Sequence, residues 1–270
     1  MLKKRLIPNI ILNEGNVVQS INFKHTNVIG NAITAVDFFN SWAVDEILVL
    51  DVSRSNDKRE KFHKIVHGFS KRCFVPLTIG GWITDINEMQ EFLTEGADKI
   101  VINSIAVRDP GIIREASKIF GSQCIVISID VKKNNSGDYE VFIDRGNEAT
   151  GLSPVDWAKQ IELQGGGEIL LTSIDHDGTK NGYDLKLLRE VSESVKIPII
   201  AFGGVGKWEH FKDGFNIGKV DAVSAANIFH YTEHSTYKAK KFLWESGINV
   251  RMPEFYKIST SRMPKYNEIF

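Results

Sequence analysis

Short apolar runs alternate with amphipathic stretches along most of the chain. Eight runs are rich in β-branched residues and apolar almost throughout, at residues 5–12, 46–51, 75–80, 99–103, 124–130, 168–174, 197–203 and 220–226. A continuous apolar run is typical of a parallel strand that is buried on both faces. The pattern therefore predicts eight strands of a parallel sheet.

Helical patterns separate these runs. Apolar residues recur at spacings of three and four in residues 32–43, 85–97, 109–121, 153–166, 184–195 and 209–218. Several of these segments begin with Asp or Ser and end with Gly, as helices commonly do. Eight strands that are each followed by a helix predict a single (β/α)8 barrel, and a doubly wound sheet is the weaker alternative. We expect the barrel to span residues 1–250 and residues 251–270 to form a C-terminal extension.

The chain repeats itself at half its length. Three segments return in order at offsets of 119 to 123 residues: EILVLD (46–51) as EILLTSI (168–174), TIGGW (78–82) as AFGGV (201–205), and PNIIL (8–12) as ISIDV (127–131). A nearly constant offset predicts two fused (β/α)4 halves whose equivalent sites face each other across the barrel.

Two segments that follow predicted strands are unusually long. Residues 13–30 follow the first strand, and residues 131–151 follow the fifth. The second contains NNSG between strand-like sequences, which predicts a small hairpin. In barrels of this kind the segments after the strands carry the chemistry.

Composition narrows the class of protein. The 270 residues include 33 Lys and Arg against 34 Asp and Glu, a net charge of −1 that argues against nucleic-acid or anionic-membrane partners. No apolar run is long enough for a membrane span, and the N-terminus lacks the cleavage site of a signal peptide. Cys73 and Cys124 form no metal or redox motif. We expect a cytoplasmic protein without a metal or a cofactor.

Carboxylates end three of the predicted strands. Asp51, Asp130 and Asp175 occupy such positions, and Asp177 follows two residues after Asp175. A carboxylate at the catalytic end of a barrel strand can accept and return a proton. Asp130 ends the most apolar of these strands and is the preferred catalytic candidate, whereas the others are explained equally well as structural caps.

Glycines follow other strands at the same end. Gly80 and Gly81 follow the third strand, Gly178 the sixth, and Gly203 and Gly204 the seventh. Glycine lets backbone N–H groups approach an anion closely. The two pairs occupy symmetry-related positions and indicate two phosphate sites.

Charged residues stand at the opposite ends of four strands. Arg5, Glu46, Lys99 and Glu168 begin the first, second, fourth and sixth strands. They are either solvated strand starts or a salt-bridged ring that closes the barrel bottom, and the residues alone leave both interpretations open.

Several segments together resemble one family. The sequences KRLIP, LTIGG, ADKIVINSIAVRDP, EILLTSIDHDGTKNGYD and IPIIAFGGVG are similar to the cyclase subunit of imidazole glycerol phosphate synthase, over about residues 1–250. The resemblance implies a half-barrel repeat that carries a class I glutaminase on its bottom. It also implies that ammonia crosses a charged gate and the barrel interior, and reacts at the top with a bisphosphorylated ribulosyl intermediate.

The resemblance also assigns roles to residues of this chain. The gate falls on Arg5, Glu46, Lys99 and Glu168, the docking aspartate on Asp98, and the second catalytic carboxylate on Asp130. Phosphate and ligand positions fall on Gly81, Asn103, Ser104, Thr172, Asp177, Gly178, Gly203, Gly204 and Asn227.

The top of the barrel departs from the family pattern. The first catalytic aspartate is Ile11, the loop lysine is Gln19, and the third glycine of the first phosphate loop is Trp82. Phe202 replaces the Ser or Thr before the second glycine pair, and Asn227 replaces a Ser. An isoleucine transfers no proton, so we expect the cyclase chemistry to be lost or altered. We also expect Trp82 to obstruct the first phosphate site and to leave the second available.

Three hypotheses about function follow. The first is a divergent paralogue of the surface-polysaccharide type, which channels ammonia to a further amidotransferase subunit that makes acetamidino sugars. The second is an active cyclase of histidine biosynthesis, and the third is a non-catalytic structural or regulatory barrel. The intact gate below an altered mouth favours the first hypothesis.

Overall fold

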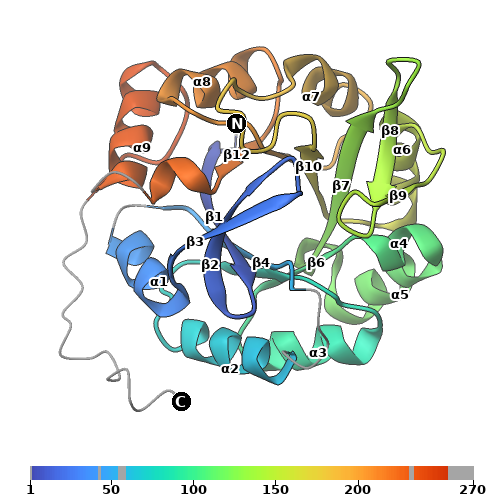
Figure 1. The fold of residues 1–270 in the computed structure, drawn as a ribbon, viewed down its shortest axis with the longest axis horizontal. Helices are drawn as coiled ribbons and strands as arrows, with labels where there is room; N and C mark the ends of the chain where they lie inside the picture. Colours follow the sequence, from blue (N-terminus) through green and yellow to red (C-terminus); the bar gives the residue numbers. More distant parts are fainter. Residues whose placement is uncertain (1, 42–43, 54–58, 231–233, 255–270) are drawn as a thin grey trace.

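The computed structural model describes residues 2–41, 44–53, 59–230 and 234–254. Among them, parallel strands close into a ring in the order β1 (Arg5–Asn13), β4 (Ile47–Asp51), β5 (Leu77–Gly80), β6 (Lys99–Ile102), β7 (Ile125–Lys133), β10 (Glu168–Ser173), β11 (Ile199–Phe202) and β12 (Ala222–Ala225). The last strand pairs with the first, Arg5 opposite Ala222 (Figure 1). This closure confirms the eight predicted strands and the (β/α)8 barrel, and it excludes a doubly wound sheet.

Helices surround the barrel (Figure 1). They are α1 (Ala32–Ser41), α2 (Arg59–Ser70), α3 (Ile86–Glu95), α4 (Ser104–Arg108), α5 (Gly111–Phe120), α6 (Pro154–Gln164), α7 (Leu185–Ser192), α8 (Trp208–Asn216) and α9 (Ser235–Glu245), with short 3-10 turns at Ser122–Cys124 and Asn227–Phe229. The expected caps are present at α3, where the Asp85 side chain accepts from the Glu88 N–H and Gly96 ends the helix in a left-handed conformation. The six predicted helices correspond to α1, α3, α5, α6, α7 and α8.

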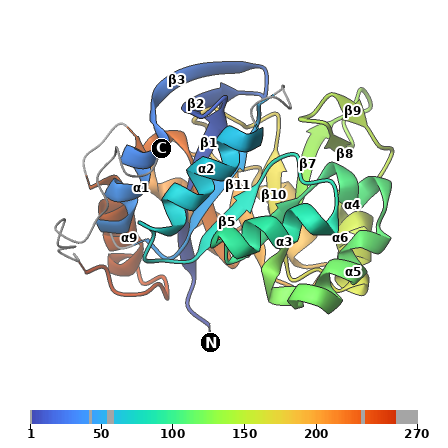
Figure 2. The same ribbon diagram turned by 90° about the horizontal axis from the view of Figure 1, so that it is seen from below.

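Antiparallel hairpins extend two of the barrel strands. After β1, β2 (Asn16–Ile21) pairs with β3 (His25–Asn31) in the first hairpin. The end of β7 pairs with β8 (Tyr139–Ile143), and β8 pairs with β9 (Glu148–Ala149); these three strands are called the second hairpin below. NNSG (134–137) lies between β7 and β8, where a hairpin was predicted, whereas the first hairpin was not predicted. Both lie over the end of the barrel opposite the N-terminus (Figure 2). Because β1 and β7 are the first strands of the two predicted halves, the hairpins agree with the half-barrel repeat.

Alternation along the strands divides the core into two layers. On β1, Leu6, Ile10 and Leu12 belong to the large cluster beneath the helices, whereas Ile7 and Ile11 belong to a second cluster inside the barrel. The inner cluster contains Ile7, Ile11, Val18, Leu48, Val101, Val126, Leu170, Ile200, Phe202, Ala222 and Ala226. The barrel interior, called the lumen below, is therefore packed mainly with apolar side chains.

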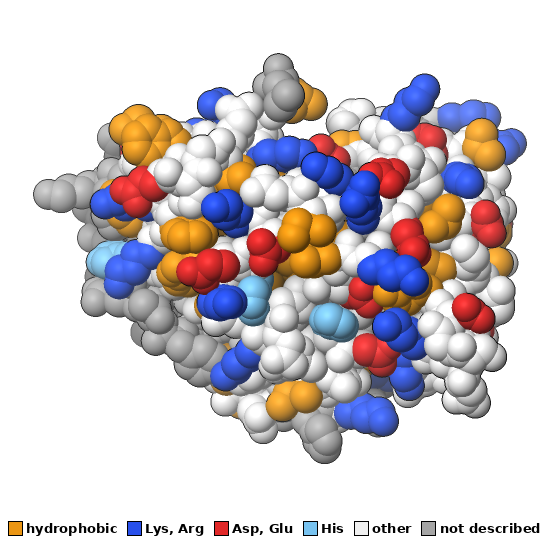
Figure 3. Space-filling view, turned by 90° about the horizontal axis from the view of Figure 1, so that it is seen from above, with side chains coloured by type: hydrophobic (Ala, Val, Ile, Leu, Met, Phe, Trp, Pro, Cys, Tyr) orange, Lys and Arg blue, Asp and Glu red, His pale blue; other side chains and the backbone are white. Residues whose placement is uncertain are grey.

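Other expectations of the sequence concern the surface and the termini. No helix within the described ranges is long and apolar enough to cross a bilayer. On the face formed by α7, α8 and α9, basic and acidic side chains are intermixed (Figure 3). Cys73 is a half-buried thiol, and burial raises its pKa to about 11, as suits an inert cysteine. Of the expected extension at 251–270, residues 255–270 lie outside the described residues.

Candidate functional site

The four charged residues at the strand starts form a closed ring. The Arg5 guanidinium donates to Glu46 Oε2 at 2.9 Å and also to Glu168. The Lys99 ammonium donates to Glu46 Oε2 at 2.8 Å and to Glu168 Oε2 at 3.0 Å. Each cation thus contacts both anions. Of the two interpretations that the sequence left open, the structure supports the salt-bridged ring, called the charged ring below.

Burial strengthens the ring. The side chains of Glu46 and Glu168 are 3% and 7% exposed, and the Thr78 hydroxyl donates to Glu46 Oε1 at 2.6 Å. Burial by itself lowers the pKa of Arg5, but its attraction to Glu168 and Glu46 outweighs this and raises that pKa overall. The four charges sum to zero. Ionised groups can persist at a partly buried site when opposite charges neutralise them and further hydrogen bonds satisfy them.

Asp98 lies beside the ring at the start of β6. Its carboxylate accepts from the Leu77 N–H at 2.8 Å, and the residue is exposed. It precedes Lys99 directly, so it stands at the outer edge of the barrel bottom. The position leaves Asp98 accessible to a partner.

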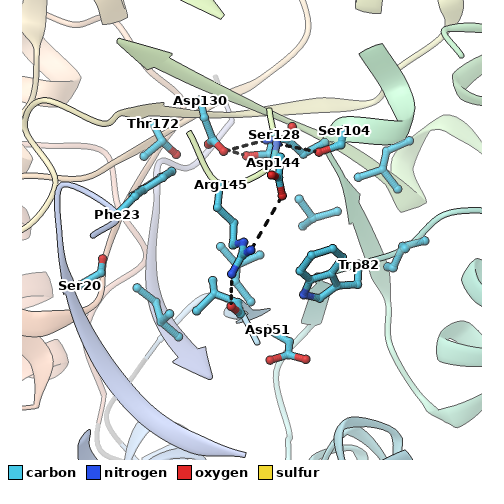
Figure 4. Close-up of a pocket in the computed structure, with 18 of the residues that line it drawn as sticks. Ser20, Phe23, Asp51, Trp82, Ser104, Ser128, Asp130, Asp144, Arg145 and Thr172 are labelled. Atoms are coloured by element: carbon cyan, nitrogen blue, oxygen red, sulfur yellow. Dashed lines mark hydrogen bonds and ion pairs between the residues drawn. The ribbon is translucent and has the colours of Figure 1, made fainter. Parts of the chain in front are cut away.

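A pocket of about 540 Å³ occupies the opposite end, where the strands finish. Figure 4 shows Asp130, Ser128 and Thr172 on one side of it and Trp82 and Asp51 across from them. The Asn103 amide donates to Asp130 Oδ2 at 2.8 Å, and the Ser128 hydroxyl donates to Asp130 Oδ1 at 3.2 Å. Asp130 therefore faces the pocket, where the sequence placed the catalytic candidate.

The environment of Asp130 tunes it for proton transfer. Burial raises the pKa of this carboxyl to about 7, against hydrogen bonds from Ser128, Thr172 and Asn103 that favour the ionised form. A pKa near neutrality suits a group that must both release and recover a proton. Burial also raises the pKa of Asp51, whose carboxylate accepts from the Ser53 hydroxyl at 2.5 Å. Asp51 is thus tied into its own loop.

The expected phosphate residues divide between two cavities. Gly81, Asn103, Ser104 and Thr172 line the large pocket. A second cavity of about 20 Å³ is lined by residues that include Asp177, Gly178, Gly203, Gly204 and Asn227. At Gly204, where φ is +95°, an added Cβ would approach Gly182 O to 2.2 Å, so only glycine fits this loop.

Two of the strand-end aspartates hold the mouth together. Asp177 accepts from the Ser20 hydroxyl at 2.6 Å and from the Phe23 N–H at 3.3 Å, which ties the first hairpin to the end of β10. Asp175 accepts from the Lys133 N–H at 2.9 Å and fixes the second hairpin. Both carboxylates are engaged in positioning loops.

Comparison with known proteins identifies the family. A family model described as "Histidine biosynthesis protein" matches residues 5–235. Three proteins named "Imidazole glycerol phosphate synthase subunit HisF", from Clostridium botulinum strains Okra, Langeland and Kyoto, are 44%, 44% and 43% identical to it. Each match covers 93% of this chain and all of the relative. The chain belongs to the HisF family.

In this member of the HisF family, Ile11 occupies the position at the mouth that the half-barrel repeat pairs with Asp130. The Ile11 side chain lies on β1, is 5% exposed and lines both cavities. Phe202, on β11, also lines both. The half-barrel counterpart of Asp130 is therefore an apolar residue that lines the pocket. Asp130 faces the pocket without a second carboxylate at position 11.

Trp82 does not fill the pocket of this HisF-family chain. The indole N–H donates to the Ser53 carbonyl, and the Arg145 guanidinium lies 5.1 Å from the indole ring centre. These contacts hold the ring against the wall. The cavity of about 540 Å³ keeps open space beside Trp82, although Phe202 lines it as well as the cavity of about 20 Å³. That Trp82 obstructs phosphate at the first site stays a prediction.

Arg145 is a pocket residue that sequence reasoning missed. It comes from the turn between β8 and β9 and reaches across the mouth, where it donates to the Val52 carbonyl at 3.2 Å (Figure 4). The backbone N–H of the adjacent Asp144 donates to Ser104 Oγ at 3.1 Å. The sequence did contain a signal for Arg145. It is a basic residue in a segment that was expected to form a hairpin at the catalytic end of the barrel.

Proposed function

We propose that this chain is the ammonia-using barrel subunit of a complex with a class I glutaminase. The observation that carries the proposal is the charged ring, which closes the bottom of the lumen directly opposite the pocket that contains Asp130. Ammonia released beneath the ring would enter through it and reach the pocket without leaving the barrel.

The lumen has the chemistry for such a path. Its inner cluster is apolar from Ile7, near the ring, to Ile11 and Phe202, near the pocket. Moving an ion through apolar surroundings is costly, whereas a small neutral molecule bears a much lower penalty. The lumen therefore favours ammonia over ammonium.

The barrel bottom also has the character of an interface. Seven exposed large hydrophobic residues of the described part lie next to strand starts or at helix C-terminal ends: Leu2, Phe74, Ile119, Leu163, Ile217, Trp244 and Met252. In a (β/α)8 barrel these positions belong to the bottom face. Exposed apolar side chains around one end of a barrel suit contact with a protein partner. Together with Asp98, they support docking of the glutaminase there.

A second part of the proposal concerns the reaction at the mouth of the barrel. Asp130 is the one member of the expected acid–base pair that carries a carboxyl, because Ile11 replaces the other. We infer that the pocket binds a phosphorylated ligand through the Gly81 and Ser104 loops, while the cyclase reaction is lost or altered.

An active cyclase of histidine biosynthesis is the second candidate. Identity of 44% across the full length of proteins named as synthase subunits favours it, and so do the retained partners of Asp130. These names support it better than they support the surface-polysaccharide role. That role, with a further amidotransferase subunit as acceptor of ammonia, rests on the resemblance and the altered mouth alone.

Association with the glutaminase tests the proposal. A class I glutaminase from the same organism is mixed with this chain, and complex formation is followed by calorimetry and gel filtration. We expect a stoichiometric complex with increased glutaminase activity. A Lys99→Met variant, which opens the charged ring, should bind but pass ammonia to the solvent. Failure of the wild-type chain to bind would refute the proposal and leave a structural or regulatory barrel.

A further inference from the structure

Two polar side chains lie inside the apolar lumen. On β1, Ile7 and Ile11 face inward, so Asn9 between them faces inward too. On β12, Ala222 belongs to the inner cluster and Val223 to the outer one, which places Ser224 on the inner side. Both residues are 0% exposed.

These side chains lack hydrogen-bond partners among the described residues. That holds for both polar atoms of the Asn9 amide and for the Ser224 hydroxyl. A buried polar group that is left unsatisfied typically costs about 1–3 kcal/mol. Native proteins contain few such groups, and each one points to a bound molecule or a functional role. Three unsatisfied atoms on adjoining strands need such an explanation.

Asn9 and Ser224 lie close together on neighbouring strands, midway along the lumen. Ser224 pairs in register with Ile7, and Asn9 stands two residues further along the neighbouring strand. From the usual strand geometry, this places the two Cα atoms roughly 8 Å apart, a gap that one small molecule can bridge. Both lie beyond Arg5 of the charged ring and before Ile11 at the mouth.

We propose that Asn9 and Ser224 form a binding site for one ammonia molecule midway along the lumen. The Asn9 carbonyl oxygen accepts an N–H of ammonia, and the amide N–H or the Ser224 hydroxyl donates to its lone pair. Ammonium has no lone pair and would carry its charge into apolar surroundings, so the site selects the neutral molecule. This inference rests on the proposed function, because it assumes that ammonia enters the lumen.

Crystallography and NMR test the site in the full-length chain. At high resolution we expect one ordered molecule within hydrogen-bond distance of Asn9 and Ser224. The side-chain amide resonance of Asn9 should shift saturably with ammonium chloride at alkaline pH, where free ammonia is abundant. The shift should disappear at mildly acidic pH with equal total ammonium, and sodium chloride should not produce it.

Two serine variants test whether the shift comes from ammonia bound in the lumen. Ser224→Ala should weaken the ammonia-dependent shift, while Ser235→Ala should leave it unchanged, because the equally buried Ser235 hydroxyl donates to the Phe229 carbonyl outside the lumen. An ordered molecule without an ammonia-dependent shift would identify a water site and overturn the proposal. Direct bonding of Asn9 to protein atoms would overturn it too. An intact ammonia response without glutaminase binding would instead contradict the proposed function.

Discussion

The two ends of the lumen differ in how their charges are paired. At the bottom, each of the cations Arg5 and Lys99 contacts both Glu46 and Glu168. At the mouth, Asp130 has hydrogen-bond donors but faces an isoleucine where the half-barrel repeat would place its partner. The bottom therefore holds a closed set of paired charges. The mouth holds Asp130 without the second carboxylate that the resemblance led us to expect.

Under the proposed function, this difference means that delivery of ammonia and its use are separable in this barrel. The charged ring is held by ion pairs between strand starts and depends on no residue of the pocket. Changes at Ile11, Trp82 and Phe202 therefore alter the chemistry at the mouth and leave the ring intact. Experiments that change one end at a time test this contrast.

The largest expected effect concerns the cyclase reaction. We expect negligible turnover of the bisphosphorylated ribulosyl intermediate, even when ammonium salt replaces the glutaminase, since loss of one acid–base group typically costs about 10²–10⁴-fold. The assay follows the intermediate's absorbance. Ile11→Asp alone should not rescue activity, because Phe202 still occupies the space between the two cavities.

Asp130→Asn is the control for that assay. Wild-type turnover of roughly 1 per second or faster that disappears in Asp130→Asn would contradict the prediction. It would make the chain a true cyclase that works with one carboxylate, and the contrast between the two ends would then fail.

The next effect concerns the stability of the charged ring. Glu168→Gln leaves Arg5 and Lys99 to share Glu46, and breaking a buried ion pair typically costs about 3–5 kcal/mol. We expect the free energy of unfolding in urea to fall by an amount of this order. Glu148→Gln is the matched control, because its pair with Arg108 is more than half exposed and should contribute about 1 kcal/mol or less. Equal losses in the two variants would show that the ring is merely a surface network.

The sequence predicted most of the fold because its strands are continuous apolar runs. It did not predict α2 or α9, whose sequences REKFHKIVHGFS and STYKAKKFLWE are interrupted by charged and polar residues and hold their place by packing. The four ring charges were visible at the strand starts. Their closure was not, because barrel closure alone brings residues 5, 46, 99 and 168 together. Arg145 was missed for a similar reason, since its hairpin crosses the mouth only in the folded barrel.

The pH dependence of stability tests the environment of Asp130. Its pKa rises from the ordinary value of 3.8 to about 7 in the folded chain. Between these values the folded state binds more protons than the unfolded state, so this group makes stability fall as pH rises from about 4 to about 7, with no further change above. Asp130→Asn should remove the decline and raise stability at pH 8 by up to about 4 kcal/mol, since one pKa unit corresponds to about 1.4 kcal/mol.

Urea unfolding across this pH range measures the effect. Asp138→Asn, at an exposed position of the second hairpin, serves as the control and should leave the decline in place. If the wild type and Asp130→Asn lose stability in parallel, Asp130 titrates like an ordinary surface carboxylate, and its role at the mouth would have to be reconsidered.

The smallest expected effect concerns the docking face. Asp98 is exposed, and its carboxylate accepts from the Leu77 N–H at 2.8 Å, so it could serve a partner or merely cap the strand. Asp98→Asn keeps an oxygen acceptor for that N–H and removes the charge, whereas Asp98→Ala removes both. If the charge contacts the glutaminase, both variants should weaken the complex by about tenfold to thirtyfold, or roughly 2 kcal/mol, as measured by calorimetry. If only Asp98→Ala weakens it, the residue acts by holding the start of β6, and recognition at the barrel bottom must reside in the apolar residues around it.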